Sequence, residues 1–367
     1  MTQDLSQITG IEHAKTYTAE EVIFEEGQSG ECMYLVLSGE VEVSVKGRPI
    51  NTLGPGSIFG EMALVDDQPR SATVKAINSS RVVPVDFDRF KRLVQQSPDF
   101  ALQVMGTMSS RLRRLLEEEV KRQRMEEELK IGREIQLSLL PKEVPIVPGW
   151  EFASFYRAAR EVGGDLFDFI ELPDDSDHLT VVIADVTGKG VPAALFMAFG
   201  RTAIRAEVLN GRSPSETLRR TNRLILMDTQ SPLLMSAFLA SFNLVDGQMT
   251  YACAGHDRPL LVNPTLGDAT IIDGKGIVLG VFDGVAIEER SIEIKHGDYV
   301  VFYTDGVTEA RQADYELFEL ERLIQTVSKA QCSSARQMVK IIVEAVEDFT
   351  GDTPQADDLT LVVARRI

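Results

Sequence analysis

Cysteine is scarce in this sequence: the 367 residues contain three, Cys32, Cys253 and Cys332. They are odd in number, far apart and never arranged as CxxC, so the sequence predicts neither a disulfide framework nor a thiolate metal site. No apolar run approaches the ~20 residues that a membrane helix needs, and the first residues lack the basic and apolar regions of a signal peptide. We therefore expect a cytoplasmic protein with no membrane partner.

Positive charge is also in the minority, with 38 Lys and Arg against 56 Asp and Glu and a formal net charge of -18. A chain of this charge repels phosphate backbones. The basic cluster from Arg111 to Arg124 is interrupted by glutamates, which is typical of a solvated helix surface rather than a binding patch. We expect no nucleic-acid partner.

The length of the chain exceeds what one hydrophobic core usually organises, so we expect more than one domain. Because the sequence contains both strand and helix patterns, we predict an α+β multidomain protein. Residues 21–86 show short apolar alternations separated by glycine turns, the pattern of an antiparallel β-roll, and a helix is expected at 87–96. We assign residues 1–96 to this domain.

A second helix is expected to begin at Ser97-Pro98-Asp99, where Ser97 can cap, Pro98 suits the first position and Asp99 complements the helix dipole. Apolar residues at helical spacing continue to Leu139, with gaps near Gln123 that break a strict heptad. We assign residues 97–140 to a helical linker that transmits a signal and forms a coiled-coil homodimer. A rigid spacer without switching is the alternative.

Residues 141–367 mix strands and helices without a βαβ repeat, so we predict an α/β sandwich there. Strands are expected at 151–157, 166–172, 178–185, 235–245, 249–254, 299–304 and 359–364, and helices at 191–209, 316–326 and 334–349. Asp185 and Asp305 terminate apolar strands, Asp357 precedes one, and Asp165 follows two glycines. Carboxylates at strand ends can converge on two Mg²⁺ or Mn²⁺ ions, and such a pair can activate water against phosphorus. Any one of these motifs alone is more often turn chemistry.

These motifs resemble, in the same order, those of the SpoIIE/RsbU branch of the PPM family of metal-dependent Ser/Thr phosphatases, over about residues 129–367. They are Glu161-Val-Gly-Gly-Asp165 with Asp168, Ala184-Asp-Val-Thr-Gly-Lys-Gly190, Tyr251-Ala-Cys-Ala-Gly-His256, Tyr303-Thr-Asp-Gly-Val307 and Asp357-Asp-Leu-Thr360. The resemblance implies that Asp185 bridges two Mn²⁺ or Mg²⁺ ions, with the Val186 carbonyl on one and Asp305 and Asp357 on the other. Asp165 would serve the second metal, directly or through water.

The resemblance also assigns Arg160, five residues before Asp165, to the substrate phosphate, with a plain surface arginine as the alternative. The general acid stays unassigned: Thr187 stands where some relatives carry a histidine, and the branch's frequent His-Gly is Lys189-Gly190 here. His256 is more often a structural turn residue in this branch.

A glycine-rich loop in the first domain, Gly54 to Leu64 followed by Pro69 to Val74, pairs backbone amides with Glu61 and Arg70. Loop amides and a short helix expected near Glu61 can approach an anion, Arg70 can meet a phosphate, and Glu61 can accept from a ribose hydroxyl. The Phe-Gly-Glu and Pro-Arg-Ser-Ala-Thr elements resemble the phosphate-binding cassette of cyclic-nucleotide-binding domains, over about residues 8–96. The resemblance implies cAMP or cGMP at Gly60, Glu61, Met62, Arg70, Ser71 and Ala72. A domain that has lost its ligand is the alternative.

Taken together, the two resemblances predict a cyclic-nucleotide-regulated phosphoserine/phosphothreonine protein phosphatase. The SpoIIE/RsbU branch commonly acts on a phosphorylated anti-anti-sigma factor, so a small phosphoprotein of that kind is the implied partner. One alternative is a catalytically weak cyclic-nucleotide sensor that binds a partner, which four intact aspartates argue against. Another, a nucleotide-regulated DNA-binding protein, is opposed by the charge and by the absence of a recognition-helix segment.

Overall fold

The computed structural model describes residues 13–62, 68–173, 175–228 and 232–367. The chain divides into two compact units, Met1–Arg124 and Met125–Ile367, and the division falls within one long helix, α4 (Pro98–Leu139). Of the helices in the described ranges, none combines the length and apolar character required to span a membrane.

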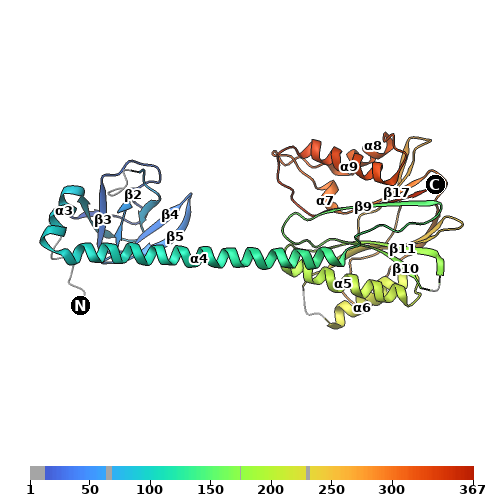
Figure 1. The fold of residues 1–367 in the computed structure, drawn as a ribbon, viewed down its shortest axis with the longest axis horizontal. Coiled ribbons are helices and arrows are strands. Elements are labelled where there is room, and N and C mark those ends of the chain that lie inside the picture. Colours follow the sequence, from blue (N-terminus) through green and yellow to red (C-terminus); the bar gives the residue numbers. More distant parts are fainter. Residues whose placement is uncertain (1–12, 63–67, 174, 229–231) are drawn as a thin grey trace. The chain divides into compact units, whose positions relative to one another are not determined.

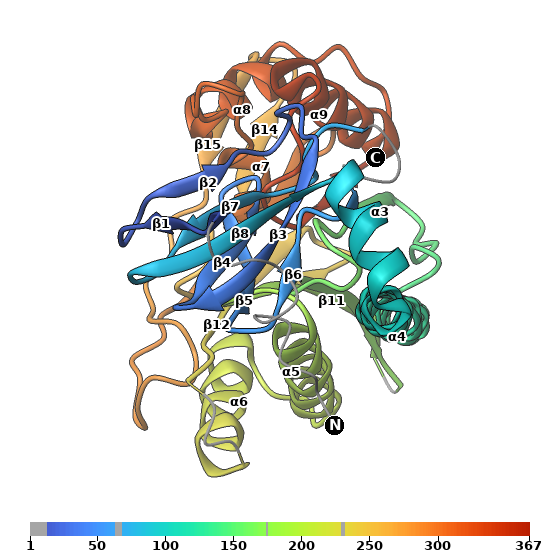
Figure 2. The same cartoon turned by 90° about the vertical axis from the view of Figure 1, so that its left-hand side faces the viewer.

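The first unit contains two four-stranded antiparallel sheets, which confirms the predicted β-roll (Figures 1 and 2). Their strand orders are β1-β8-β3-β6 and β2-β7-β4-β5. The strands are β1 (Lys15–Tyr17), β2 (Val22–Phe24), β3 (Cys32–Ser38), β4 (Val41–Val45), β5 (Arg48–Leu53), β6 (Ile58–Phe59), β7 (Thr73–Ala76) and β8 (Ser80–Asp86).

Two helices follow the roll where the sequence predicted them. Asp86 caps α3 (Phe87–Gln96) by accepting from the Arg89 backbone N–H, and α4 begins at Pro98. Leu93, Phe100 and Val104 are buried against strand residues such as Leu35. This packing fixes the start of α4 on the roll, because burying apolar side chains is the main favourable term in folding.

The second unit is a sandwich of two five-stranded antiparallel sheets, as predicted (Figure 1). The first has the order β10-β11-β12-β13-β16 and the second β15-β14-β17-β18-β9. These strands are β9 (Trp150–Arg157), β10 (Leu166–Leu172), β11 (Asp175–Val186), β12 (Met235–Asn243), β13 (Gln248–Ala254), β14 (Leu260–Asn263), β15 (Asp268–Ile271), β16 (Glu289–Glu293), β17 (Tyr299–Tyr303) and β18 (Leu359–Arg366). Large apolar side chains from both sheets, such as Phe238 and Phe302, fill the space between them.

Helices cover both outer faces of this sandwich (Figure 1). The first sheet carries α5 (Val191–Leu209) and α6 (Pro214–Asp228), and the second carries α8 (Glu319–Ser328) and α9 (Ala335–Thr350). The sequence did not predict α6, the short strands β14, β15 and β16, or the four-residue helix α7 (Asp305–Thr308). Helix α8 starts three residues later than predicted, because Leu317 pairs with Arg311 in an isolated bridge instead.

Candidate functional site

The four predicted aspartates lie at the ends of strands from both sheets of the sandwich. Asp165 directly precedes β10 and Asp185 lies near the end of the neighbouring β11. Asp305 begins α7 just after β17, and Asp357 lies two residues before the neighbouring β18. The two sheets are joined at this point, because the hydroxyls of Thr304 and Thr360 both donate to Asp165 Oδ2.

The glycine loop that carries Asp165 is held by two residues to which the sequence assigned no role. Asp358 accepts from the backbone N–H groups of Gly164, at 2.6 Å, and of Ala159, at 2.8 Å. Gln136 of α4 is buried and bonds both polar atoms of Gly163: Nε2 donates to the carbonyl at 2.7 Å, and Oε1 accepts from the N–H at 3.0 Å. The adjacent Asp357 and Asp358 in the sequence could have drawn attention to Asp358, whereas nothing in the sequence pointed to Gln136.

Burial and mutual repulsion shape the electrostatics of this cluster. Burial is the main cause that raises the pKa of Asp305 to about 7, followed by the charges of Asp185 and Asp357. Burial likewise raises the pKa of Asp185 to about 6 and that of Asp165 well above its usual range. Such shifts show that the folded chain disfavours the accumulated negative charge, which a bound cation would neutralise.

A lysine side chain lies next to the cluster. Lys189 Nζ lies 2.6 Å from Asp357 Oδ2 and donates to the Ala356 carbonyl at 2.7 Å. This lysine occupies the position at which the resemblance led us to look for a histidine. Arg160, predicted to bind substrate phosphate, is exposed, and in the ranges that the structure describes no ion pair joins it to the cluster.

The donor set fits a hard divalent cation such as Mg²⁺ or Mn²⁺, which prefers oxygen ligands and keeps several waters. Gly164 makes room for one of these donors, because a Cβ there would lie 2.9 Å from the Val186 carbonyl oxygen and 3.5 Å from Asp185 Oδ1. Across the described ranges no three Asp, Glu, His or Cys side chains surround a single point. Backbone carbonyl and water ligands would therefore have to complete each coordination shell.

Two further polar residues of the family motifs have structural roles. Asp168 is buried and pairs with Arg201 at 2.9 Å and Arg205 at 2.8 Å, which ties β10 to α5. His256 is buried, its Nδ1 lies 2.7 Å from Ser236 Oγ, and burial lowers its pKa to about 4. A neutral, hydrogen-bonded His256 agrees with the predicted structural role.

In the first unit, Arg70 is buried and turned into the roll. Its Nη1 donates to the Gly60 carbonyl at 2.9 Å, its Nη2 to the Cys32 carbonyl at 2.7 Å, and its guanidinium lies 4.2 Å from the centre of the Phe24 ring. Among the residues that the structure describes, the buried Arg70 Nε has no hydrogen-bond partner. A side chain at Gly30 would displace this guanidinium, so glycine there lets Arg70 keep its position in the roll.

Glu61 is buried and forms an ion pair with Arg111 of α4, which also donates to the Ile58 carbonyl at 2.5 Å. The sequence had placed Arg111 on a solvated surface, and no signal marked it as a partner of Glu61. Of the other predicted ligand residues, Ala72 is buried, while Ser71 is exposed and its hydroxyl lies 3.7 Å from Met62 Sδ. The short helix expected to begin near Glu61 would extend into residues 63–67, which lie outside the described residues.

Comparison with known proteins matches both units. The family model "Stage II sporulation protein E (SpoIIE)" matches residues 175–367, and the model "Cyclic nucleotide-binding domain" matches residues 14–97. The phosphoserine phosphatase RsbU of Bacillus subtilis is 31% identical over 246 residues, which cover 66% of this chain and 71% of that protein.

Two more relatives extend the likeness. The SiaA-PP2C domain of Pseudomonas aeruginosa is similar in structure with a TM-score of 0.59, at 20% identity, over 67% of this chain and 98% of the domain. At that identity the likeness shows the fold alone. The cAMP-dependent protein kinase regulatory subunit of Emericella nidulans is 41% identical over 80 residues, or 21% of this chain and 19% of that subunit.

Proposed function

The chain belongs to the SpoIIE family of protein serine/threonine phosphatases and carries a cyclic-nucleotide-binding domain, and from this premise we propose that a cyclic nucleotide regulates its phosphatase activity. The observation that supports the catalytic part most strongly is the carboxylate cluster. Chain segments far apart in sequence bring Asp165, Asp185, Asp305 and Asp357 to one edge of the sandwich, where burial, together with the neighbouring carboxylates, raises the pKa of three of them.

We assign the residues as follows. Asp185, Asp305, Asp357 and Asp165, together with the Val186 carbonyl, would hold two Mn²⁺ or Mg²⁺ ions. When bound, the ions supply the Lewis-acid chemistry that activates water for attack on phosphorus. Thr304, Thr360 and Asp358 hold Asp165 and its loop, and Arg160 is free to reach the phosphate of a bound protein from its exposed turn.

The proposed regulatory ligand is cAMP or cGMP. Arg70 and Glu61 are both present and buried, and a buried arginine whose Nε has no partner among the described residues is suited to a phosphate. The Emericella relative is named for its dependence on cAMP, which favours cAMP as the first ligand to test.

The proposed substrate is a small phosphoprotein of the anti-anti-sigma-factor kind, in keeping with the name phosphoserine phosphatase given to RsbU. We further propose a homodimer formed through α4. Its middle turns expose Leu112, Leu115, Leu116 and Val120, each with 47% or more of its surface accessible, and apolar stripes of this kind are usually covered by a partner helix.

The test is phosphate release from a phosphoserine peptide with Mn²⁺, with and without cAMP or cGMP. We expect the wild type to be active only with metal and to respond to one of the nucleotides. Asp305→Asn should lose at least about a hundredfold of the activity with metal, with or without nucleotide. Absence of metal-dependent activity would overturn the catalytic assignment, whereas activity indifferent to nucleotide, with no nucleotide binding, would overturn the regulatory one alone.

A further inference from the structure

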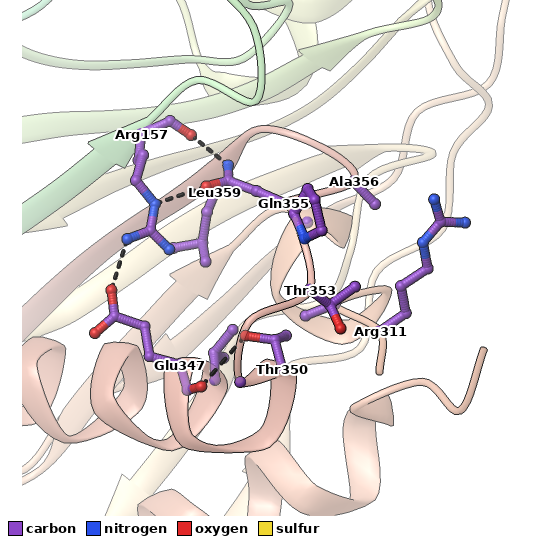
Figure 3. Close-up of a pocket in the computed structure, with 13 residues that line it drawn as sticks. Arg157, Arg311, Glu347, Thr350, Thr353, Gln355, Ala356 and Leu359 are labelled. Atoms are coloured by element: carbon purple, nitrogen blue, oxygen red, sulfur yellow. Dashed lines mark hydrogen bonds and ion pairs between the residues drawn. The ribbon is translucent and has the colours of Figure 1, made fainter. Parts of the chain in front are cut away.

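A cavity of about 420 Å³ opens beside the carboxylate cluster in the second unit (Figure 3). The end of β9, the residues at and after α7, the last turn of α9 and the loop at residues 351–356 form its walls. Its volume lies within the ~300–1,000 Å³ of clefts that bind ligands. It is therefore large enough to hold side chains of a bound polypeptide.

The cavity shares two of its walls with the catalytic site. Gly306, which lines it, directly follows Asp305, and Ala356, which also lines it, directly precedes Asp357. These walls touch each other, because a side chain at Gly306 would collide with the Asp358 carbonyl. A group bound in the cavity therefore lies next to two chain segments that supply carboxylates to the site.

The charges on one side of the cavity are satisfied within the chain. Arg157 Nη1 lies 2.6 Å from Glu347 Oε1, and Arg157 Nε donates to Gln355 Oε1 at 2.6 Å. Gln355 Nε2 in turn donates to the carbonyls of Arg157 and Asp357. This side, seen with Arg157 and Glu347 in Figure 3, holds the loop before Asp357 in place.

Arg311, on the other side in Figure 3, differs. Its side chain is exposed, its guanidinium lies 5.5 Å from the centre of the Tyr315 ring, and within the described part of the chain no carboxylate is paired with it. The carboxylates of the neighbouring site repel anions, whereas the positive charge of Arg311 attracts them. Arg311 is therefore the residue of the cavity that would bind an anionic group.

From this arrangement we infer that the cavity binds the polypeptide segment that flanks the phosphoserine of the protein substrate, and that Arg311 selects an acidic side chain in that segment. The inference rests on the proposed function. It assigns Arg311 to substrate selection rather than to the chemical step, because Arg311 lies across the cavity from the bonds that hold Asp357.

The experiment compares phosphoserine peptides that differ in one residue, Glu or Lys, placed in turn at each of the three positions on either side of the phosphoserine. We expect the wild type to prefer Glu at one or two of these positions by about three- to tenfold in kcat/KM, mainly through KM, as befits an exposed ion pair. Arg311→Glu should reverse the preference at the same positions.

Arg336→Glu is the matched control, because Arg336 is also an exposed arginine but lies at the opposite end of α9 from the cavity. It should keep the wild-type preference. Thr353→Trp, which fills the cavity, should raise KM for the peptides more than for p-nitrophenyl phosphate, which lacks flanking residues.

Two results would overturn the inference, and they are distinguishable. If the peptides are hydrolysed and Arg311→Glu leaves the Glu to Lys preference at every position as in the wild type, the cavity does not select the flanking segment. If p-nitrophenyl phosphate is hydrolysed but none of the peptides is, the proposed function itself fails as well.

Discussion

The two candidate sites of this chain differ in how their charged side chains are arranged. In the sandwich, several carboxylates lie close together, and burial, followed by their mutual repulsion, raises the pKa of Asp305 and Asp185; Lys189 is paired with Asp357. In the roll, the acid and the base expected to bind a nucleotide already have protein partners, Arg111 for Glu61 and the Cys32 and Gly60 carbonyls for Arg70.

The difference indicates how each site responds to its ligand. A bound cation reduces the repulsion among carboxylates that a rigid fold holds close together. Metal binding is therefore expected to increase the stability of the folded chain. Charges that are already paired must exchange a protein partner for the nucleotide. The free energy of nucleotide binding is then only the difference between the new contacts and those that are lost. The first arrangement suits a resident metal, and the second suits a ligand that comes and goes.

The largest effect is expected from Asp305→Asn, which removes one charge from the cluster. Phosphatase activity with Mn²⁺ should fall by at least about a hundredfold, because a metal ligand is lost. In a chelator, the same variant should unfold at a higher temperature than the wild type, since removing a charge that burial and repulsion both disfavour gains about 1–3 kcal/mol. Calorimetry with and without Mn²⁺ measures both stabilities.

Asp348→Asn provides the control for that comparison, because Asp348 is an exposed aspartate of α9 outside the cluster. It should change neither activity nor melting temperature. A lower melting temperature for Asp305→Asn in chelator would contradict the view that burial and repulsion disfavour the charge of Asp305.

Arg70→Gln tests the other half of the comparison. Loss of a charge-assisted contact to phosphate should weaken cAMP binding by about 10- to 150-fold. Titration calorimetry with cAMP and cGMP measures the effect, and Arg48→Gln, an exposed arginine of β5, should bind as the wild type does. Equal affinity in Arg70→Gln and wild type would mean that Arg70 serves only the packing around Phe24.

Most of the fold was predictable from local pattern. Strong apolar runs predicted β10 and β17, and the helical spacing from Val191 predicted α5 to its end. The missed elements had weaker signals. Helix α7 is a single turn that begins at Asp305, and β14 to β16 are four or five residues long, too short for periodicity to distinguish them from loops.

The carboxylates themselves were predictable because each is adjacent to an apolar strand, whereas their supporting contacts were not. Gln136 meets Gly163 across 27 residues and Arg111 meets Glu61 across 50, so both pairs depend on tertiary folding. A surface helix with glutamates and arginines has the same composition whether one arginine is solvated or buried in an ion pair. The type of a residue indicates which interactions its side chain can form, but the tertiary fold decides which residue it contacts.

Arg111→Gln sharpens the comparison within the first unit. If Arg111 competes with the ribose for Glu61, its removal should tighten cAMP binding by about fivefold, the value of roughly 1 kcal/mol. Arg114→Gln is the control, because Arg114 lies on the same helix and pairs with Glu118 at 3.5 Å on the surface. Weaker binding in Arg111→Gln would show instead that Arg111 positions Glu61 for the nucleotide.

The smallest effect is expected from Lys189→Met, which removes the cation from the carboxylate cluster. Lys189 and a metal would share Asp357, so the variant should bind Mn²⁺ about two- to fivefold more tightly, in line with the modest strength of half-exposed ion pairs. Titration calorimetry with Mn²⁺ measures the affinity without reference to activity. Lys340→Met, an exposed lysine of α9 paired with Glu344, should leave the affinity unchanged. If Lys189→Met binds Mn²⁺ more weakly, the lysine acts by holding the Asp357 loop through the Ala356 carbonyl. In both sites, a basic side chain paired within the protein would then position the groups that bind the ligand.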